Sequence, residues 1–216
     1  MIEQIVYALP FLLGGFQTTL IVSVLVVVIS LVGGVLLGVA LIYGPLAVRL
    51  LIRVFSDTIR GIPILVLLFF VYYGLPAAGM PLDAFTSAVV ALTLFKIAQV
   101  IEYVRGAVQS VPKGQDEAAK AIGLTFTGRL REVIFPQAFR RFLPPWINGV
   151  ADAVKGSALV SLLGVIDLMY AINQVIGRTY DAMPLYVLGA FIYISINYAL
   201  SATSRHVERR FSYIRE

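Results

Sequence analysis

A few ionisable and amide side chains interrupt otherwise apolar stretches of the sequence, and these residues could do chemistry. Lys96, Gln99 and Glu102 are spaced by three residues, which predicts that they share one side of a helix. Asp152 and Lys155 have the same spacing and could form an ion pair. Within a membrane span each ionised group costs about 2.5–3.5 kcal/mol, so each suggests a task. The groups could line a path for a polar solute, or they could pair with one another and stabilise the helices.

The sequence offers no catalytic or metal-binding set beside these residues. It contains no cysteine, and its one histidine, His206, lies among arginines near the C-terminus. These counts exclude a disulfide framework, a thiolate zinc site, a cysteine nucleophile and a histidine-rich metal site. The G-x-x-x-x-G-K-[ST] phosphate loop is also missing, so we do not expect this chain to bind ATP in that way. A membrane enzyme would need a catalytic set that the sequence does not supply.

The composition is typical of a membrane protein. Of the 216 residues, 59% are hydrophobic and 13% are charged, with a mean hydropathy of +0.90. Soluble domains are about 45–50% apolar and about 25% charged, so a disordered chain and an ordinary soluble enzyme are excluded. The net charge of +5 comes from basic groups that punctuate apolar stretches. A nucleic-acid-binding protein would present one continuous basic face, so we expect no nucleic-acid partner.

We expect an all-α polytopic fold in which residues 1–216 form a single transmembrane domain. Because a span needs about 20 apolar residues, five helices are predicted, at about 16–42, 57–75, 84–108, 142–165 and 182–204. Pro10 and the Gly14–Gly15 pair predict a separate interfacial or short N-terminal segment at 4–13. The basic groups then lie on one side, in the 43–60 connection, the 105–141 connection and the C-terminal tail. The positive-inside rule predicts an outside N-terminus and a cytoplasmic C-terminus.

The 105–141 connection contains a short predicted helix at about 115–124. Pro112 and Gly114 end the preceding helix, and the acidic residues Asp116 and Glu117 suit the first turn of a new one. Gly123 is the residue type that commonly follows a helix C-terminus. On physical grounds alone, this helix could serve only as an element of the membrane interface.

The residues of this connection resemble a known motif. E-A-A at 117–119, G at 123 and V-I-F-P at 133–136 are similar to the EAA motif of ABC importer permeases, in which the last segment reads I-x-L-P. The two departures, Val for Ile and Phe for Leu, stay apolar. R-G-I-P-I-L at 60–65 and E-Y-V-R-G-A-V-Q-S-V-P-K-G-Q at 102–115 extend the similarity. The chain resembles permease subunits of the polar amino-acid class of type I ABC importers, the histidine/glutamine-type group, over most of its length.

The resemblance implies a transport subunit that is not itself an enzyme. The short helix would be a coupling helix seated in a cleft of an ATP-binding subunit, and that partner would bind ATP and Mg, so this chain would need no cofactor. The residues that would dock are Glu117 as the anchor, with Ala118, Ala119, Gly123 and Pro136. Further partners would be a second permease chain, identical or not, and an extracytoplasmic solute-binding protein. The resemblance also implies the bacterial cytoplasmic (inner) membrane.

The resemblance leaves the solute open. Members of the class often carry two carboxylates in the fourth span, and here both positions are glycines, Gly149 and Gly156. A lysine- or arginine-type solute is therefore not expected at this half of the pore. Either a partner chain holds the solute, or Lys96 and Lys155 favour an anionic or bulky one. Ser157 could donate to solute, although serines in membrane helices often donate to their own backbone.

Overall fold

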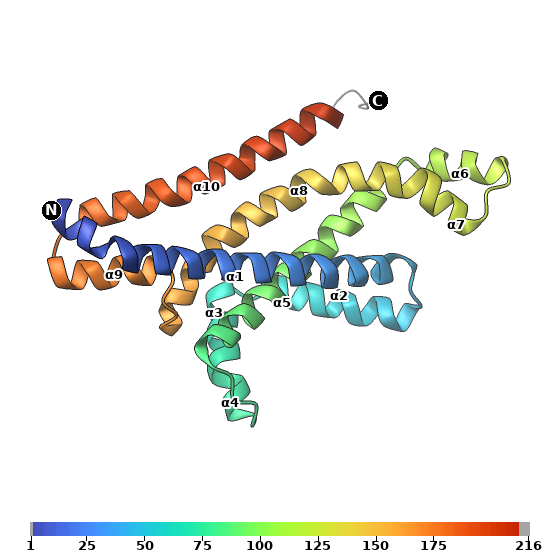
Figure 1. The fold of residues 1–216 in the computed structure, drawn as a ribbon. Helices are drawn as coiled ribbons and strands as arrows, with labels where there is room; N and C mark the ends of the chain where they lie inside the picture. Colours follow the sequence, from blue (N-terminus) through green and yellow to red (C-terminus); the bar gives the residue numbers. More distant parts are fainter. Residues whose placement is uncertain (1, 212–216) are drawn as a thin grey trace.

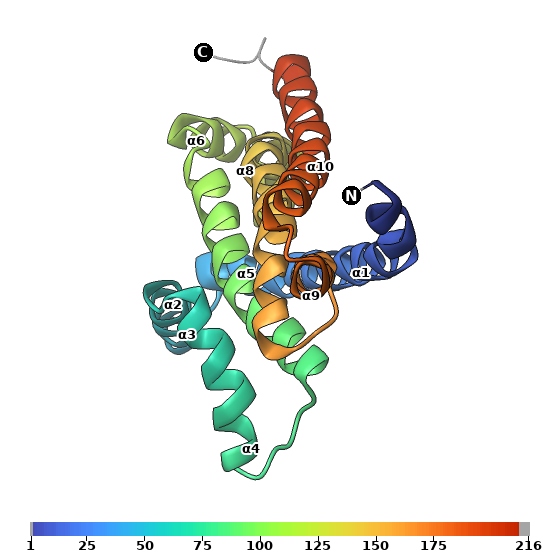
Figure 2. The ribbon, with the colours of Figure 1, turned by 90° about the vertical axis from the view of Figure 1, so that its left-hand side faces the viewer.

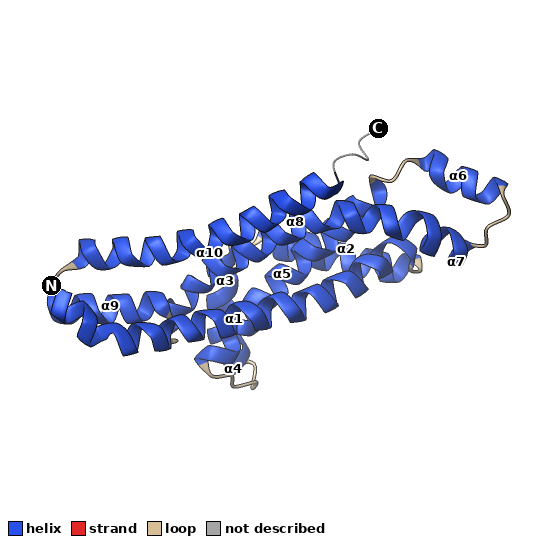
Figure 3. Cartoon of the chain, turned by 45° about the horizontal axis from the view of Figure 1, so that its top comes forward, coloured by secondary structure: helices blue, strands red, loops and turns tan. Residues whose placement is uncertain are grey.

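The computed structural model describes the backbone of residues 2–211 and the side chains of residues 8–206, and every regular element in this part is a helix (Figures 1 and 3). In chain order the elements are α1 (Ile2–Tyr43), α2 (Leu46–Gly61), α3 (Ile64–Phe69), the π-helix η1 (Phe70–Gly74), α4 (Leu75–Ala77), α5 (Ala84–Gln109), α6 (Lys113–Ala121), α7 (Phe126–Arg129), the π-helix η2 (Leu130–Ile134), α8 (Phe135–Gly156), the 3₁₀-helix η3 (Ser157–Leu163), α9 (Leu168–Thr179) and α10 (Ala182–Phe211). Figure 1 shows α6, α7 and the α1–α2 turn toward one end of the molecule, and the N-terminus with α9 toward the other.

Three of these helices are long and apolar enough to cross a membrane, namely α1 from Ala8, α5, and α10 up to His206. Two further pairs of segments meet this test only when each pair is taken together. The pair formed by α2 and the α3–α4 segment is bent by 106°, and the pair formed by residues 126–163 and α9 is bent by 51°. By length and composition, the described residues therefore offer three to five crossings.

The N-terminal helix is continuous, so the separate interfacial segment predicted at 4–13 is wrong. Pro10 lies inside α1 rather than before it. A proline is tolerated in an apolar helix because neighbouring groups compensate for the lost backbone hydrogen bond. Gly15 does not break the helix. It allows α1 to pack closely against the start of α9, since a Cβ atom there would lie 2.6 Å from the carbonyl oxygen of Asp167.

The second predicted helix, at 57–75, is also wrong in its bounds. Its sequence contains Pro63, which lacks a backbone N–H and forces the preceding residue out of the helical region. Ile62 accordingly has φ −85° and ψ 129°, and the chain turns sharply there. The helix before this break already begins at Leu46, so Arg49 and Arg53 lie on α2 and not in a connecting loop.

The other three predicted helices differ less. α5 coincides with the range 84–108 to within one residue, and α10 begins at Ala182 as expected but continues to Phe211. In place of a helix at 142–165, α8 begins earlier, at Phe135, and gives way to η3 after Gly156.

α5 is the central helix of the molecule. In its most apolar window 50% of the residues are buried, against 11% in α10. α5 packs against α1, α2, α3 and α8, and Figure 2 shows it running beside α8 and across α1. Gly34 and Gly38 of α1 allow this crossing, because Cβ atoms there would lie 2.5 and 2.7 Å from the Cβ atoms of Val100 and Val104. The polar residues of α5 are thus held between several neighbours.

Candidate functional site

The short helix α6 lies at one end of the molecule and is closed by a Schellman motif. The N–H of Gly123 donates to the carbonyl of Lys120 over 2.9 Å, and the N–H of Leu124 donates to the carbonyl of Ala119 over 3.1 Å. Gly123 has a φ of +82°, in the left-handed region that favours glycine. Gly123 thus follows the helix as expected, although α6 spans Lys113–Ala121 instead of about 115–124.

Polar contacts fix α6 to the segment that follows it. Asp116 accepts from Lys120 over 2.7 Å and from Arg129 over 2.8 Å. The hydrogen bond from Lys120 and the charge of Arg129 hold the pKa of the Asp116 carboxyl below its ordinary value. Gln137 of α8 donates to Gln115 over 3.3 Å. α6 is consequently attached both to α7 and to the start of α8.

The surface of α6 differs from the expected one at Ala119. Glu117 and Ala118 are exposed, as are Gly123 and Pro136. Among the side chains of residues 8–206, none forms a hydrogen bond or ion pair with the Glu117 carboxylate. Ala119, which was expected to meet a partner protein together with these residues, is only 3% exposed. Its small side chain instead lets α6 pack closely on its own chain.

The polar residues of α5 do not form the single stripe that was expected. The Lys96 ammonium donates to the Gln99 amide oxygen over 2.7 Å, which accounts for the first two residues. Glu102 lies about 120° around the helix axis from Lys96, because each residue advances a helix by about 100°. Its carboxylate accepts instead from Arg105, over 3.0 Å from the Nε atom. α5 therefore carries two polar sites rather than one.

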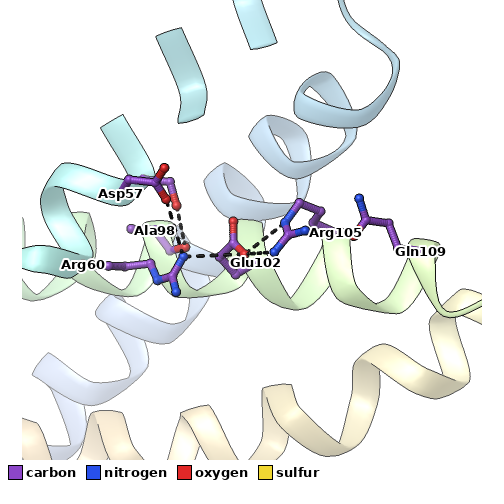
Figure 4. Close-up of polar contacts among 7 residues, drawn as sticks. Asp57, Arg60, Ala98, Glu102, Arg105 and Gln109 are labelled. Carbon is purple, nitrogen blue, oxygen red and sulfur yellow. Dashed lines mark hydrogen bonds and ion pairs between the residues drawn. The ribbon is translucent and has the colours of Figure 1, made fainter. Parts of the chain in front are cut away.

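The second of these sites joins α5 to the end of α2 (Figure 4). Glu102 lies between Arg105 and Arg60, with its Oε2 atom 3.5 Å from the Arg60 Nη1 atom. Arg60 also approaches Asp57, at 3.9 Å, and Arg105 donates to Gln109 over 2.8 Å. Asp57 and Arg60 were not expected as site residues from the sequence. The available signal was an arginine directly before the Gly-Ile-Pro break.

Two residues of α8 form the predicted ion pair. The Lys155 ammonium lies 2.8 Å from the Asp152 carboxylate, and more than half of each side chain is exposed. Ser157, at the end of α8, is fully buried and donates to the carbonyl of Val154 over 2.8 Å. This hydrogen bond corresponds to the alternative role expected for Ser157, in which a serine in a membrane helix donates to its own backbone.

Lys96, on α5, lies next to α1 and α8. Its side chain lines a small cavity with Ser30, Tyr103, Trp146 and Gly149, with room of about 10 Å³, enough for roughly one water molecule. Lys96 is 8% exposed. Within the part of the chain that the structure describes, no three His, Cys, Asp or Glu side chains are placed to hold a metal ion.

Known proteins resemble this chain in sequence and in structure. A family described as "Binding-protein-dependent transport system inner membrane component" matches residues 30–213. The glutamine transport system permease protein GlnP of Escherichia coli (strain K12) is 37% identical over 205 residues, 94% of each chain. The probable glutamine ABC transporter permease protein GlnP of Bacillus subtilis (strain 168) is 34% identical over 206 residues, also 94% of each. A crystal structure of an amino acid ABC transporter with histidines superimposes with a TM-score of 0.91 at 33% identity, covering 96% of this chain and 97% of that one.

Proposed function

The chain belongs to the family of binding-protein-dependent transport system inner membrane components, and from this premise we propose that it is the permease subunit of an ATP-driven importer of amino acids or similar small polar solutes. The names of its relatives support the solute class, since those proteins are permeases for glutamine or other amino acids. In this proposal the chain forms half of the pore and hydrolyses nothing itself. ATP and Mg are bound by a partner.

The observation that carries the proposal is the surface of α6. Glu117 is an exposed carboxylate without a partner among the described side chains, and it sits on a helix that is fixed to its own chain by Asp116 and Gln115. An unpaired charge on a rigid helix suits a charge-assisted hydrogen bond to another protein. Glu117, Ala118, Gly123 and Pro136 would form the surface that contacts the ATP-binding subunit.

The proposal puts the α6 end of the molecule in the cytoplasm and the N-terminus outside. The start of α2, whose sequence carries Arg49 and Arg53, lies toward the same end as the α6–α7 segment, which agrees with the positive-inside rule (Figures 1 and 3). With each bent pair taken as one span, the chain crosses the membrane five times. The homologues lead us to assign it to the bacterial inner membrane.

Exposed charges on the helices support a second permease chain. The Asp57–Arg60–Glu102–Arg105 cluster and the Asp152–Lys155 pair are partly exposed on helices that the proposal places in the membrane. Charges there avoid lipid and face a water-filled cavity or another protein. A second permease chain, identical or not, would enclose these groups with a path for the solute. The family description supports an extracytoplasmic solute-binding protein as a further partner.

Copurification and a charge reversal test the proposal. The chain is purified in mild detergent with its co-expressed neighbours, and ATP hydrolysis and ATP-driven uptake are measured. We expect an ATP-binding subunit to copurify, and Glu117→Lys to abolish uptake without lowering the amount of inserted protein. Glu132→Lys is the matched control, because Glu132 is another exposed glutamate near α6. Normal uptake by the Glu117→Lys complex would contradict the docking role of Glu117. If no ATPase copurifies with the chain, the proposal that ATP hydrolysis by a partner drives transport is contradicted.

A further inference from the structure

We propose that Lys96, assisted by Lys155, forms a subsite for a carboxylate of the transported solute. This inference rests on the proposed function, and it names the chemical group that the pore recognises. The charge distribution along α5 is unusual. A lysine lies at the middle of the central helix, where charged residues are rarely tolerated without a partner.

The Lys96 ammonium is buried beside a neutral group. Its side chain is 8% exposed, and it donates to the amide oxygen of Gln99. Among the side chains of residues 8–206, no carboxylate oxygen lies within ion-pair distance of it. Burying an ammonium without a counter-charge is costly, and a group retained at that cost in a membrane protein indicates a functional site.

The nearest charges leave the cluster with one positive charge in excess. Asp152 and Lys155 are close enough to act electrostatically on Lys96, and they are paired with each other at 2.8 Å. The Asp152 carboxylate is therefore already neutralised by Lys155. Because more than half of each side chain of that pair is exposed, the cluster continues from buried Lys96 to the surface of α8. A solute carboxylate would balance the charge.

The backbone beside Lys155 is open, whereas the backbone beside Lys96 is closely packed. Gly156 follows Lys155 directly, and a Cβ atom there would meet no heavy atom within 4 Å. A Cβ atom at Gly149 would approach the ring of Tyr103 to 3.0 Å, so that glycine lets the two helices lie close beside Lys96. Neither position supplies a carboxylate that would compete with one from the solute.

Two sources of this carboxylate are compatible with the site. It could be the α-carboxylate, which all amino acids share, or the side-chain carboxylate of an acidic amino acid. The shared chemistry is a charge-assisted hydrogen bond from an ammonium to a carboxylate. The two sources differ in which solutes a change at Lys96 affects.

Uptake by the complete transporter tests the inference. Proteoliposomes containing the complex are supplied with its solute-binding protein and ATP, and KM is measured for each standard amino acid that the wild type transports. We expect Lys96→Met and Lys96→Gln to raise KM about 10- to 100-fold, since a lost hydrogen bond to a charged group has an effect of this size. Lys96→Arg should keep KM within a few fold. Arg131→Gln removes one exposed cation elsewhere and should leave KM unchanged.

A stability measurement separates recognition from a structural role. Relieving the buried charge should leave the Lys96→Met complex at least as resistant to heat as the wild type. A rise in KM for every amino acid identifies the α-carboxylate, and a rise for acidic amino acids alone identifies the side chain. Unchanged KM values, or lost stability with unchanged KM, overturn the inference. If the wild type transports no amino acid, the proposed function is wrong and the inference falls with it.

Discussion

The crossing of α1 and α5 depends on Gly34, and replacing this glycine by alanine should weaken the fold. The added Cβ atom would lie 2.5 Å from the Cβ and 2.6 Å from the Cγ1 atom of Val100, and 3.2 Å from the carbonyl oxygen of Ile97. A β-branched side chain has little rotamer freedom in a helix, so Val100 cannot turn away. The two helices must separate instead, and overpacking of this kind costs about 1–3 kcal/mol.

A second glycine in the same helix isolates this cost. Alanine has a higher helix propensity than glycine by up to about 1 kcal/mol, which partly offsets the clash in Gly34→Ala. A Cβ atom added at Gly14 would meet no heavy atom within 4 Å, so Gly14→Ala gains the propensity without the clash. The difference in unfolding free energy between the two variants should therefore be about 1–3 kcal/mol.

Thermal unfolding in detergent measures this difference. A destabilisation of this size lowers the midpoint by roughly 5 °C in a chain of this length, by comparison with soluble domains. Gly34→Ala should also reduce uptake, because α5 carries both Lys96 and Glu102. Equal unfolding temperatures for Gly34→Ala and Gly14→Ala would refute this prediction, because they would show that the close approach of the two helices does not limit stability.

Two more predictions concern buried and exposed hydrogen bonds. Thr19→Val should lower the free energy of unfolding by about 1–3 kcal/mol, because the buried Thr19 hydroxyl accepts a hydrogen bond from the first N–H of α9 over 3.1 Å. Thr18 is next to Thr19 and partly exposed, so Thr18→Val should lower it by less in the same thermal assay. Asp116→Asn should loosen α6, seen as faster proteolysis between α6 and α7, because Lys120 and Arg129 lose their carboxylate. Lys120 and Arg129 lower the pKa of Asp116, so the attachment of α6 to α7 should persist above the ordinary pKa of a carboxyl group and weaken as the pH falls below it. Proteolysis between α6 and α7 that does not depend on pH would contradict this prediction.

Helix positions could be predicted where apolar windows end at local turn signals. α5 lies between a Pro/Gly-rich turn and Pro112, and its bounds follow from those residues. The same rule failed at Pro10 and Gly15, since a helix break and a close packing contact use the same residue types. Only the presence of α9 against Gly15 distinguishes the two. The 106° bend after α2 could be expected at Pro63, but its size depends on tertiary packing.

In the candidate site, too, features set by neighbouring residues could be predicted, and features set by tertiary packing could not. The glycine that follows α6 is encoded locally and could be found from the sequence, whereas the start of the helix was placed two residues too late. The burial of Ala119 depends on how α6 packs on distant residues, which no local pattern reveals. Likewise, their spacing predicted that Lys96 and Glu102 belong to one polar stripe. In the structure Lys96 contacts Gln99 and Glu102 contacts Arg60, which lies on another helix, so the two residues belong to different sites.

The segment from α7 to η3 has a mechanical consequence. Helical structure runs without a break from Phe126 to Leu163, because the π-helical turn η2 joins α7 to α8. At about 1.5 Å per residue this stretch has a contour length of roughly 57 Å. α6 is fastened near one end of it through Asp116 and Arg129, and the Asp152–Lys155 pair lies toward the other. A tilt of the whole stretch by about 5° about its α6 end would displace the far end by about 5 Å, nearly the rise of one helical turn.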